Sequence, residues 1–362
     1  MDRAYPRVEV NLKKLRHNID AVVSRCNAAG IMVAGVVKGF NAFLPGVRQF
    51  EESACYAIAT SRLEHFEEMQ QAGVKGPFLA IRVPMLGEVP DLVRLADASL
   101  NSELSVLRAI DAECEKQGKT HGAVLMADLG DLREGFWDKD ELVRVAAIVE
   151  RELKNVRLLG VGTNLGCYGS INPSVENLTE LVSITERIEA EIGRELEIIS
   201  GGGTTTLPLV LDGTIPKRIN HLRIGEAILL GKDLEDLWKV DMHFVKKDVF
   251  TVKAEIMEIK EKPSYPIGEI FVDCYGNKVE YEDRGIRKRA LAGLGKLDFV
   301  FGDALVPRAP GIEVLGGSSD HLILDIEDDP VQRQVGDILE FDVRYATMMY
   351  TTASRYMKMV AV

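Results

Sequence analysis

The sequence predicts an α/β fold, in which a (β/α)8 barrel over residues 1–235 is followed by an antiparallel β-domain over residues 236–362. Two observations lead to this prediction. In the first part of the chain, short and almost continuously apolar runs alternate with amphipathic stretches, as expected for parallel strands covered on both faces. Near residue 236 the pattern changes to longer strand-like runs separated by Pro, Gly and Asp turns, which is typical of an antiparallel sheet.

Eight apolar runs supply the expected barrel strands: 31–37, 54–60, 77–82, 97–100, 122–127, 157–163, 196–200 and 219–224. This many strand–helix alternations in about 235 residues indicates a closed barrel of the TIM type. A doubly wound open sheet remains the alternative, because an alternating pattern does not by itself show whether the sheet closes.

Amphipathic helices are expected between the strands. Residues 12–29 place their apolar side chains on one helical face. Ser61 is expected to cap a helix over 61–72, because Glu64 stands three residues later as in a capping box. Similar helical patterns cover 102–117, 139–154 and 174–193.

The β-domain is predicted from four strand-like runs, which cover 249–259, 269–275, 321–326 and 338–343. Each is rich in β-branched and aromatic residues and is bounded by turn residues. A short strand at Val8–Val10 joins either this domain or the barrel.

The composition is that of a globular chain of 362 residues with a net charge of -12. Nucleic acid and anionic membranes attract a positive field, so this charge argues against either as the main partner. The five cysteines are scattered without a C-x-x-C spacing, so we expect neither a disulfide framework nor a metal site. No apolar run approaches the ~20 residues of a membrane span, and the N-terminus lacks the apolar core of a signal peptide. We therefore expect a reduced, cytoplasmic protein.

Lys38 follows the first expected barrel strand in the segment A-G-V-V-K-G-F-N. One interpretation is that the strand has simply reached solvent. The other is that the amine is held at the barrel mouth, where removal from water lowers its proton affinity and makes it a usable nucleophile. Barrel enzymes place their chemistry at the C-terminal strand ends, which is where Lys38 is expected.

Three further features follow expected strand ends. The segment S-G-G-G-T-T-T-L, residues 200–207, combines close backbone approach with hydroxyl donors, which suits an anion, although a flexible turn with a helix cap has the same composition. Arg223 stands two residues before Gly225, whose N–H group can complete an anion cup. Arg133 either clamps a carboxylate or is a solvated loop residue.

An amine, an anion cradle and two arginines at one barrel face suit pyridoxal 5'-phosphate (PLP). Its aldehyde takes a lysine as a Schiff base, and its phosphate needs a cup of neutral donors. An arginine that faces the pyridine nitrogen would keep that nitrogen unprotonated, which favours simple proton transfer over deeper carbanion chemistry.

These motifs resemble the alanine-racemase-like, fold-type III PLP enzymes over almost the whole chain, and within them the ornithine racemase branch. V-V-K-G-F-N is similar to the PLP-lysine segment, D-L-G-D-L-R-E-G-F to the arginine loop, S-G-G-G-T-T-T to the phosphate loop, and R-I-G-E-A to the segment that meets the ring nitrogen and phosphate. In the β-domain, K-P-S-Y-P-I-G-E-I-F-V-D-C-Y-G-N, E-D-R-G-I-R-K-R-A and G-G-S-S-D-H-L-I-L-D are similar to the ornithine racemase branch.

The resemblance implies site residues by position. Arg133 would meet both the cofactor and the substrate carboxylate, and Thr204 stands in the place of a phosphate-binding serine. A homodimer is also implied, in which the β-domain of one chain completes the partner's active site. The full set of implied cofactor-binding residues is Lys38, Arg133, Asn164, Ser200, Gly202, Gly203, Thr204, Arg223, Gly225, Glu226 and Tyr345.

Three positions depart from the alanine racemase pattern. Lys296, in G-K-L-D-F, stands where those enzymes place a catalytic tyrosine. Asn164 replaces a histidine that backs the PLP ring, and the tyrosine that follows the PLP lysine is missing near Ala42 and Phe43. The second acid/base is therefore open among residues that the partner would supply: Lys296, Asp298, Ser318, Ser319, Asp320 and His321.

The sequence thus predicts a PLP-dependent racemase for a basic amino acid, ornithine first and lysine second. Lys38 is expected to hold the cofactor and remove the α-proton, with Lys296 or Asp320 as the second catalytic group. The alternatives are a PLP-dependent decarboxylase, an alanine or broad-specificity racemase, and a non-catalytic PLP carrier. The expected substrate contacts are Arg133, Asp298, Ser319 and His321, and a distal ammonium group could be held by Asp298, Asp320 or Glu226.

Overall fold

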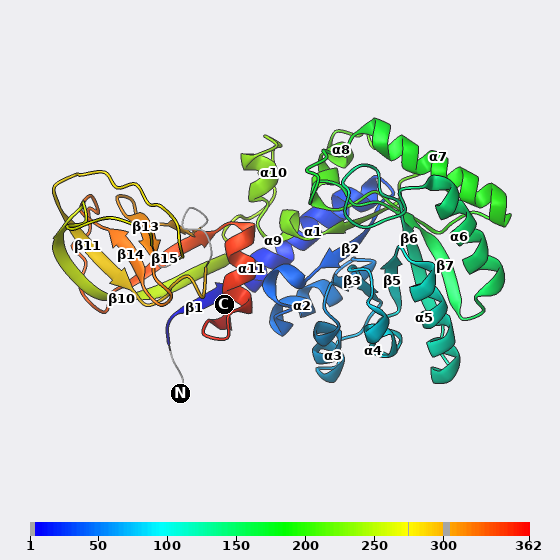
Figure 1. The fold of residues 1–362 in the computed structure, drawn as a ribbon, viewed down its shortest axis with the longest axis horizontal. Helices are drawn as coiled ribbons and strands as arrows, with labels where there is room; N and C mark the ends of the chain where they lie inside the picture. Colours follow the sequence, from blue (N-terminus) through cyan, green and yellow to red (C-terminus); the bar gives the residue numbers. More distant parts are fainter. Residues whose placement is uncertain (1–3, 274, 300–304) are drawn as a thin grey trace. The chain divides into compact units, whose positions relative to one another are not determined.

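The computed structural model describes residues 4–273, 275–299 and 305–362. The chain forms two compact units. One comprises residues 13–246 and contains the barrel. The other comprises residues 247–362 together with the N-terminal residues up to Leu12, and it contains the antiparallel sheet (Figure 1). Within the described ranges, no helix combines the length and the apolar character that a bilayer crossing requires.

The first unit is a closed barrel of parallel strands. Its closure is seen at β2, which pairs with β3 on one side and with β9 on the other. The barrel prediction is therefore confirmed, and the open doubly wound sheet is excluded. In order, the strands are β2 (Met32–Val36), β3 (Ala57–Thr60), β4 (Phe78–Ala80), β5 (Ala98–Asn101), β6 (His121–Met126), β7 (Val156–Gly162), β8 (Ile198–Ser200) and β9 (His221–Ile224).

Alternate residues of the strands fill the barrel interior. Ala34 and Val36 of β2 and Val124 and Met126 of β6 are buried in one apolar cluster with residues of the neighbouring strands. The period of two follows from the alternation of side chains along a strand. Because the interior is packed, substrate chemistry has room only at an end of the barrel.

Helices cover the outer face of the barrel (Figure 1). The expected capping box at Ser61 and Glu64 is wrong: α3 begins at Leu63, and its N-cap is Arg62, which is extended and makes no side-chain cap. The start one residue later leaves the Ser61 hydroxyl out of position. The helices are α1 (Leu12–Ala28), α2 (Leu44–Glu51), α3 (Leu63–Gln71), α4 (Val89–Leu95), α5 (Leu104–Gln117), α6 (Lys139–Glu152), α7 (Val175–Ile192), α8 (Leu207–Leu211), α9 (Glu226–Leu229) and α10 (Lys232–Asp236), with short 3-10 turns η1 (Lys38–Phe40), η2 (Leu86–Glu88) and η3 (Thr204–Thr206).

The second unit is a sheet with the strand order β12-β15-β10-β11-β14-β13. The N-terminal strand β1 (Arg7–Val10) belongs to it, because β1 pairs antiparallel with β10 and parallel with β16. The remaining elements are β10 (Phe250–Pro263), β11 (Ile286–Ala292), β12 (Leu305–Pro307), β13 (Glu313–Gly317), β14 (Leu322–Asp325), β15 (Ile338–Val343), α11 (Tyr345–Ala353) and β16 (Lys358–Ala361).

The strand expected at 269–275 is wrong for the residues that the structure describes there, which form no strand. The segment between β10 and β11 is an irregular loop. Asp273 turns it by accepting hydrogen bonds from the backbone N–H groups of Tyr275 and Asn277, at 2.9 and 2.8 Å. Apolar composition alone predicted a strand here, although Phe271 is 79% exposed and therefore packs against little.

Candidate active site

The sequence-predicted barrel residues meet at the C-terminal ends of the strands. Lys38 opens η1 directly after β2, and Asn164 follows β7. Ser200 is the last residue of β8, and Arg223 lies in β9. Because all barrel strands are parallel, these positions share one end of the barrel.

The Lys38 amine lies among charged groups at this end. Its side chain is exposed, yet the protein atoms packed around the amine lower the pKa of Lys38 by burial. The cations of Arg133 and Arg223 lower this pKa further, whereas Cys167 and Glu134 oppose the shift. Lys38 therefore faces both predicted arginines, and an amine in this environment gives up its proton more readily than a surface lysine.

The backbone after Lys38 is held in an unusual conformation that the sequence did not reveal. Asn41 and Ala42 have positive φ angles of 50° and 48°. His65 fixes this turn, because its ring nitrogens contact Asn41 Oδ1 at 3.0 Å and Thr60 Oγ1 at 2.8 Å. Burial lowers the pKa of His65, so the ring is neutral and bridges the two groups. The sequence offered one signal for this conformation, which is that Asn adopts positive φ angles more often than most residues.

Arg223 is a buried cation with neutral partners. Its guanidinium donates to Ser200 Oγ and, at 2.8 Å, to the carbonyl of Thr163. Ser200 Oγ accepts from Arg223, so its own proton is available to His221 Nδ1 at 2.8 Å. Burial lowers the pKa of His221 to about 3 and that of Arg223 to about 10. In this hydrogen-bonded series of Arg223, Ser200 and His221, Arg223 is therefore the residue that is charged at neutral pH.

The triple-glycine segment forms a close-fitting turn above β8. Gly202 has φ +117°, and a Cβ there would lie 2.7 Å from Thr206 Oγ1. A Cβ on Gly203 would lie 3.0 Å from the carbonyl of Arg223. Thr204 Oγ1 accepts the backbone N–H of Ala227 at 3.2 Å, which joins this turn to the start of α9. Neither glycine could therefore carry a side chain without displacing its neighbours.

We expect Gly202→Ala to lower the free energy of unfolding by about 2 kcal/mol, because the substitution adds both backbone strain and the contact with Thr206. Gly213→Ala is the matched control, since Gly213 also has a positive φ but nothing lies within 4 Å of its added Cβ. That control should cost about 1 kcal/mol. Urea unfolding measures both values, and equal losses would contradict the close fit at Gly202.

Asn164 presents a buried polar atom to this end of the barrel. Its Nδ2 has no hydrogen-bond partner among the described residues.

Asp131 holds two neighbouring loops together, and the sequence analysis did not identify it. The Asp131 carboxylate accepts three backbone N–H groups, of Gly166, Cys167 and Tyr168, at 3.0–3.2 Å. The only sequence signal was its place in the arginine loop.

Arg133 is paired with its neighbour. It donates through Nε and Nη2 to the two carboxylate oxygens of Glu134. Burial opposes the charge, but Glu134 outweighs it and raises the pKa of Arg133. An incoming carboxylate would therefore meet Arg133 through its other donors or replace Glu134.

Glu226 turns its carboxylate to α10 and not to an open cavity. Oε1 accepts the backbone N–H groups of Lys232 and Asp233, at 2.9 and 3.1 Å. Oε2 is buried without a partner among the described residues. Burial raises the pKa of Glu226 from 4.5 to about 7, helped by the charge of Asp233.

Glu226 predicts a pH-dependent stability. The folded chain binds this proton more tightly than the unfolded chain, so stability falls as the pH rises between the two pKa values, from 4.5 to about 7. Relative to Glu226→Gln, the native chain should lose up to about 3 kcal/mol between pH 4.5 and pH 8. Urea unfolding of both proteins at these two pH values measures the change, and a constant difference would contradict the assignment.

In the second unit, the structure brings Lys296 beside Ser319 and Asp320. The Lys296 N–H donates to the carbonyl of Ser318 at 2.8 Å, and Leu297 N–H donates to that of Ser319 at 3.2 Å. The Lys296 ammonium group lies 4.5 Å from the centre of the Tyr275 ring. This distance is that of a cation–π contact.

The other predicted residues of this unit differ in what they offer. Asp298 is buried, and its two oxygens accept from Ser354 Oγ at 2.7 Å and Gly295 N–H at 3.2 Å. His321 Nδ1 lies 3.3 Å from Ser318 Oγ in an exposed turn. Tyr345 is half-buried as the first residue of α11. The barrel residues and these residues thus form two groups, one in each unit.

Comparison with known proteins shows the family of this chain. Residues 10–233 match the family model described as alanine racemase, N-terminal domain. An ornithine racemase of Acetoanaerobium sticklandii is 38% identical over 355 residues, covering 98% of this chain and 99% of that protein. This chain belongs to the alanine racemase family. The predicted resemblance is thereby confirmed.

A further curated relative and two solved structures extend the comparison. A lysine racemase of Thermotoga maritima is 36% identical over 360 residues, covering 98% of both chains. The solved alanine racemase of Clostridium difficile 630 has a TM-score of 0.74 and 19% identity, covering 99% of this chain and 96% of that one. A D-threonine aldolase from Filomicrobium marinum has a TM-score of 0.72 and 17% identity, covering 97% and 90%. The solved structures show the shared fold, whereas the curated relatives are racemases.

Proposed function

We propose that the chain is a PLP-dependent racemase of a basic amino acid, with ornithine as the first candidate and lysine as the second. The observation that carries the proposal is the Lys38 amine, whose pKa is lowered at the same barrel end as the close-fitting triple-glycine turn. The names of two near-full-length relatives, an ornithine racemase and a lysine racemase, support the substrate class.

The residues at the barrel end fit PLP. Lys38 would take its aldehyde, and Gly203, Thr204 and the amides at Gly225 and Glu226 would hold its phosphate. Asn164, with its unpartnered buried amide, would lie against the ring. When bound, PLP supplies an electron-withdrawing ring that acidifies the α-hydrogen of an amino acid.

Arg223 explains why the site suits racemisation. Its guanidinium would face the ring nitrogen of bound PLP and keep that nitrogen unprotonated, which would favour simple proton transfer over deeper carbanion chemistry. Its neutral partners Ser200 and His221 hold the guanidinium in place without cancelling its charge. Arg133 lies on the Lys38 side of the site and would hold the substrate carboxylate.

Two lysines on opposite faces of Cα would complete the reaction. Lys38, with its lowered pKa, would remove the α-proton from one face of Cα. Lys296, which lies over the Tyr275 ring, would return a proton to the other face. We assign Lys296 to the partner subunit of a homodimer, so that the β-domain of each chain completes the other's active site.

The experiment that tests this function incubates the PLP-loaded chain with L-ornithine, L-lysine, L-arginine, L-alanine and L-serine. D-Product and carbon dioxide are both measured. We expect D-ornithine or D-lysine to form fastest, with no carbon dioxide released. Formation of carbon dioxide, or inversion of alanine and not of the basic amino acids, would overturn the proposal.

A further inference from the structure

The second unit contains a cavity of about 630 Å³, and Lys296 is one of the residues that line it. Strands β11, β13 and β14 form one side of it, and the irregular loop between β10 and β11 forms the other. The volume is within the usual range of small-molecule sites. Its charged lining includes Glu280, Glu282, Arg284, Arg289, Lys296 and Glu313.

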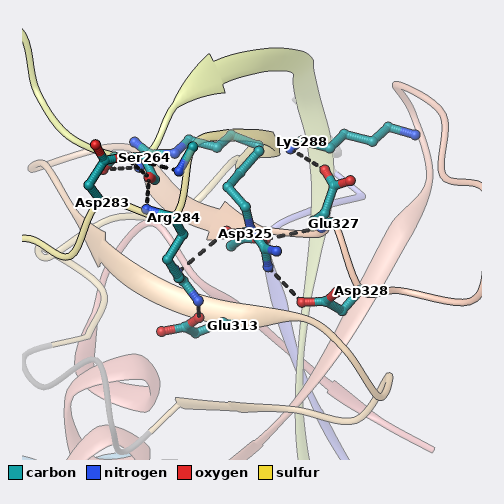
Figure 2. Close-up of polar contacts among 11 residues, drawn as sticks. Ser264, Asp283, Arg284, Lys288, Glu313, Asp325, Glu327 and Asp328 are labelled. Carbon is teal, nitrogen blue, oxygen red and sulfur yellow. Dashed lines mark hydrogen bonds and ion pairs between the residues drawn. The ribbon is translucent and has the colours of Figure 1, made fainter.

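Charges at the margin of the cavity are paired with one another. Figure 2 shows Arg284 between Glu313 and Asp325, and the ion-pair distances are 2.9 and 3.5 Å. Asp325 also accepts from Arg287 at 2.9 Å. Burial opposes the Asp325 charge, but these arginines hold the pKa of Asp325 below its ordinary value. These ion pairs hold the loop between β10 and β11 against the sheet. The charges of Arg284 and Glu313 are therefore already paired without a ligand.

Three other charged residues in the lining form no ion pair among the described residues. Arg289 donates one hydrogen bond, to the carbonyl of Ser264 at 2.9 Å, and its buried Nε has no partner among the described residues. Glu280 and Glu282 have no ion pair or hydrogen bond within the part of the chain that the structure describes. Both line the cavity from the irregular loop between β10 and β11.

The unpaired groups are thus one guanidinium and two carboxylates in one cavity. The ligand that complements them carries one carboxylate and two ammonium groups, which is the charge pattern of a free diamino acid. We propose that this cavity binds a basic amino acid without covalent attachment, with its carboxylate on Arg289 and its ammonium groups on Glu280 and Glu282. Carboxylate–guanidinium and carboxylate–ammonium contacts are among the stronger hydrogen bonds in proteins.

Lys296 links this cavity to the proposed reaction, and this part of the inference rests on the proposed function. Lys296 lines the cavity, but its charge already faces Tyr275 and Asp273. An amino acid held by Arg289, Glu280 and Glu282 would therefore lie beside the residue that we propose as the proton donor. The cavity would serve as a capture site for substrate next to the point of reaction.

Equilibrium dialysis of radiolabelled L-ornithine against the full-length, PLP-loaded chain tests the inference. We compare the native protein with Glu280→Gln/Glu282→Gln and with the charge-matched control Glu261→Gln/Glu269→Gln, whose positions do not line the cavity. The cavity variant should lose one bound equivalent per chain, and the control should lose none. Equal binding by all three proteins would overturn the inference.

The difference between variants separates this inference from the proposed function. Suppose that the cavity variant binds one equivalent of ornithine fewer than the native chain, but the native chain racemises no amino acid. The proposed function then fails and the cavity site stands. If the native chain racemises ornithine and the cavity variant binds as many equivalents as the native chain, the cavity site fails alone.

Arg289→Gln supplies a second test with its own probe. This variant should bind ornithine in the cavity at least about tenfold more weakly, because the ligand carboxylate loses a charged partner. Binding of 1,4-diaminobutane, which has no carboxylate, should not change. Thermal unfolding checks that the variant is folded. Equal loss of both ligands, or loss of neither, would contradict the assigned orientation.

Discussion

Lys38→Ala should lose at least about 10³-fold in racemisation of L-ornithine, since one substitution removes both the attachment point of the cofactor and the first proton-transfer group. The reason lies in its surroundings. Burial and the charges of two arginines lower the pKa of Lys38. The segment around it, residues 31–46, contains no other lysine that could replace it. Chiral chromatography of D-ornithine measures the activity, and visible absorbance measures the bound cofactor.

Lys154→Ala is the control, because Lys154 is an exposed lysine of the same unit. It should keep native activity. Added methylamine should restore part of the activity of Lys38→Ala, since a free amine can then enter the emptied position. Turnover of Lys38→Ala within tenfold of the native rate would refute the assignment of Lys38.

Lys296→Ala should separate two processes that occur together in the native protein. Inversion should fall by about 10²–10⁴, the range that one acid–base group contributes. Exchange of the α-hydrogen with solvent should continue for one enantiomer, because Lys38 still removes and returns a proton on its own face. Proton NMR in D₂O measures exchange, and chiral chromatography measures inversion. Lys278→Ala, an exposed lysine of the same unit, serves as control.

Mixing two inactive variants tests whether the active site is shared. In a heterodimer of Lys38→Ala and Lys296→Ala, one site keeps both lysines if Lys296 comes from the partner. Random exchange of subunits should then restore about a quarter of native activity. If both lysines act within one chain, mixing restores nothing, and Lys296 is then assigned to the wrong subunit.

The barrel could be predicted from sequence because its signals are local. Each strand is a short apolar run, and Lys38 and Arg223 lie at fixed distances from strand ends. The expected strand at 269–275 and the Ser61 cap failed for the opposite reason, since a strand needs a neighbouring strand and a cap needs a particular backbone angle. Neither requirement is visible in composition.

The candidate site was predicted less completely where partners are distant in sequence. Asp298 looked available for a substrate ammonium group, but its carboxylate holds Ser354, which lies 56 positions further along the chain. The link from Thr60 through His65 to Asn41 and the role of Asp131 in ordering a distant loop depend in the same way on tertiary packing. Patterns of residue types identify which side chains can carry chemistry. The hydrogen-bond partners that already occupy those side chains are seen only in the folded chain.

The pairing of β1 has a consequence for synthesis of the chain on the ribosome. Residues 13–246 can assemble their barrel as soon as they emerge, but Arg7–Val10, made first, must wait for Phe250–Lys253 and then for Lys358–Ala361. The earliest segment therefore remains an unsatisfied strand edge for almost the whole of translation. Shortening the chain by a dozen residues at its beginning should impair the unit that is completed last.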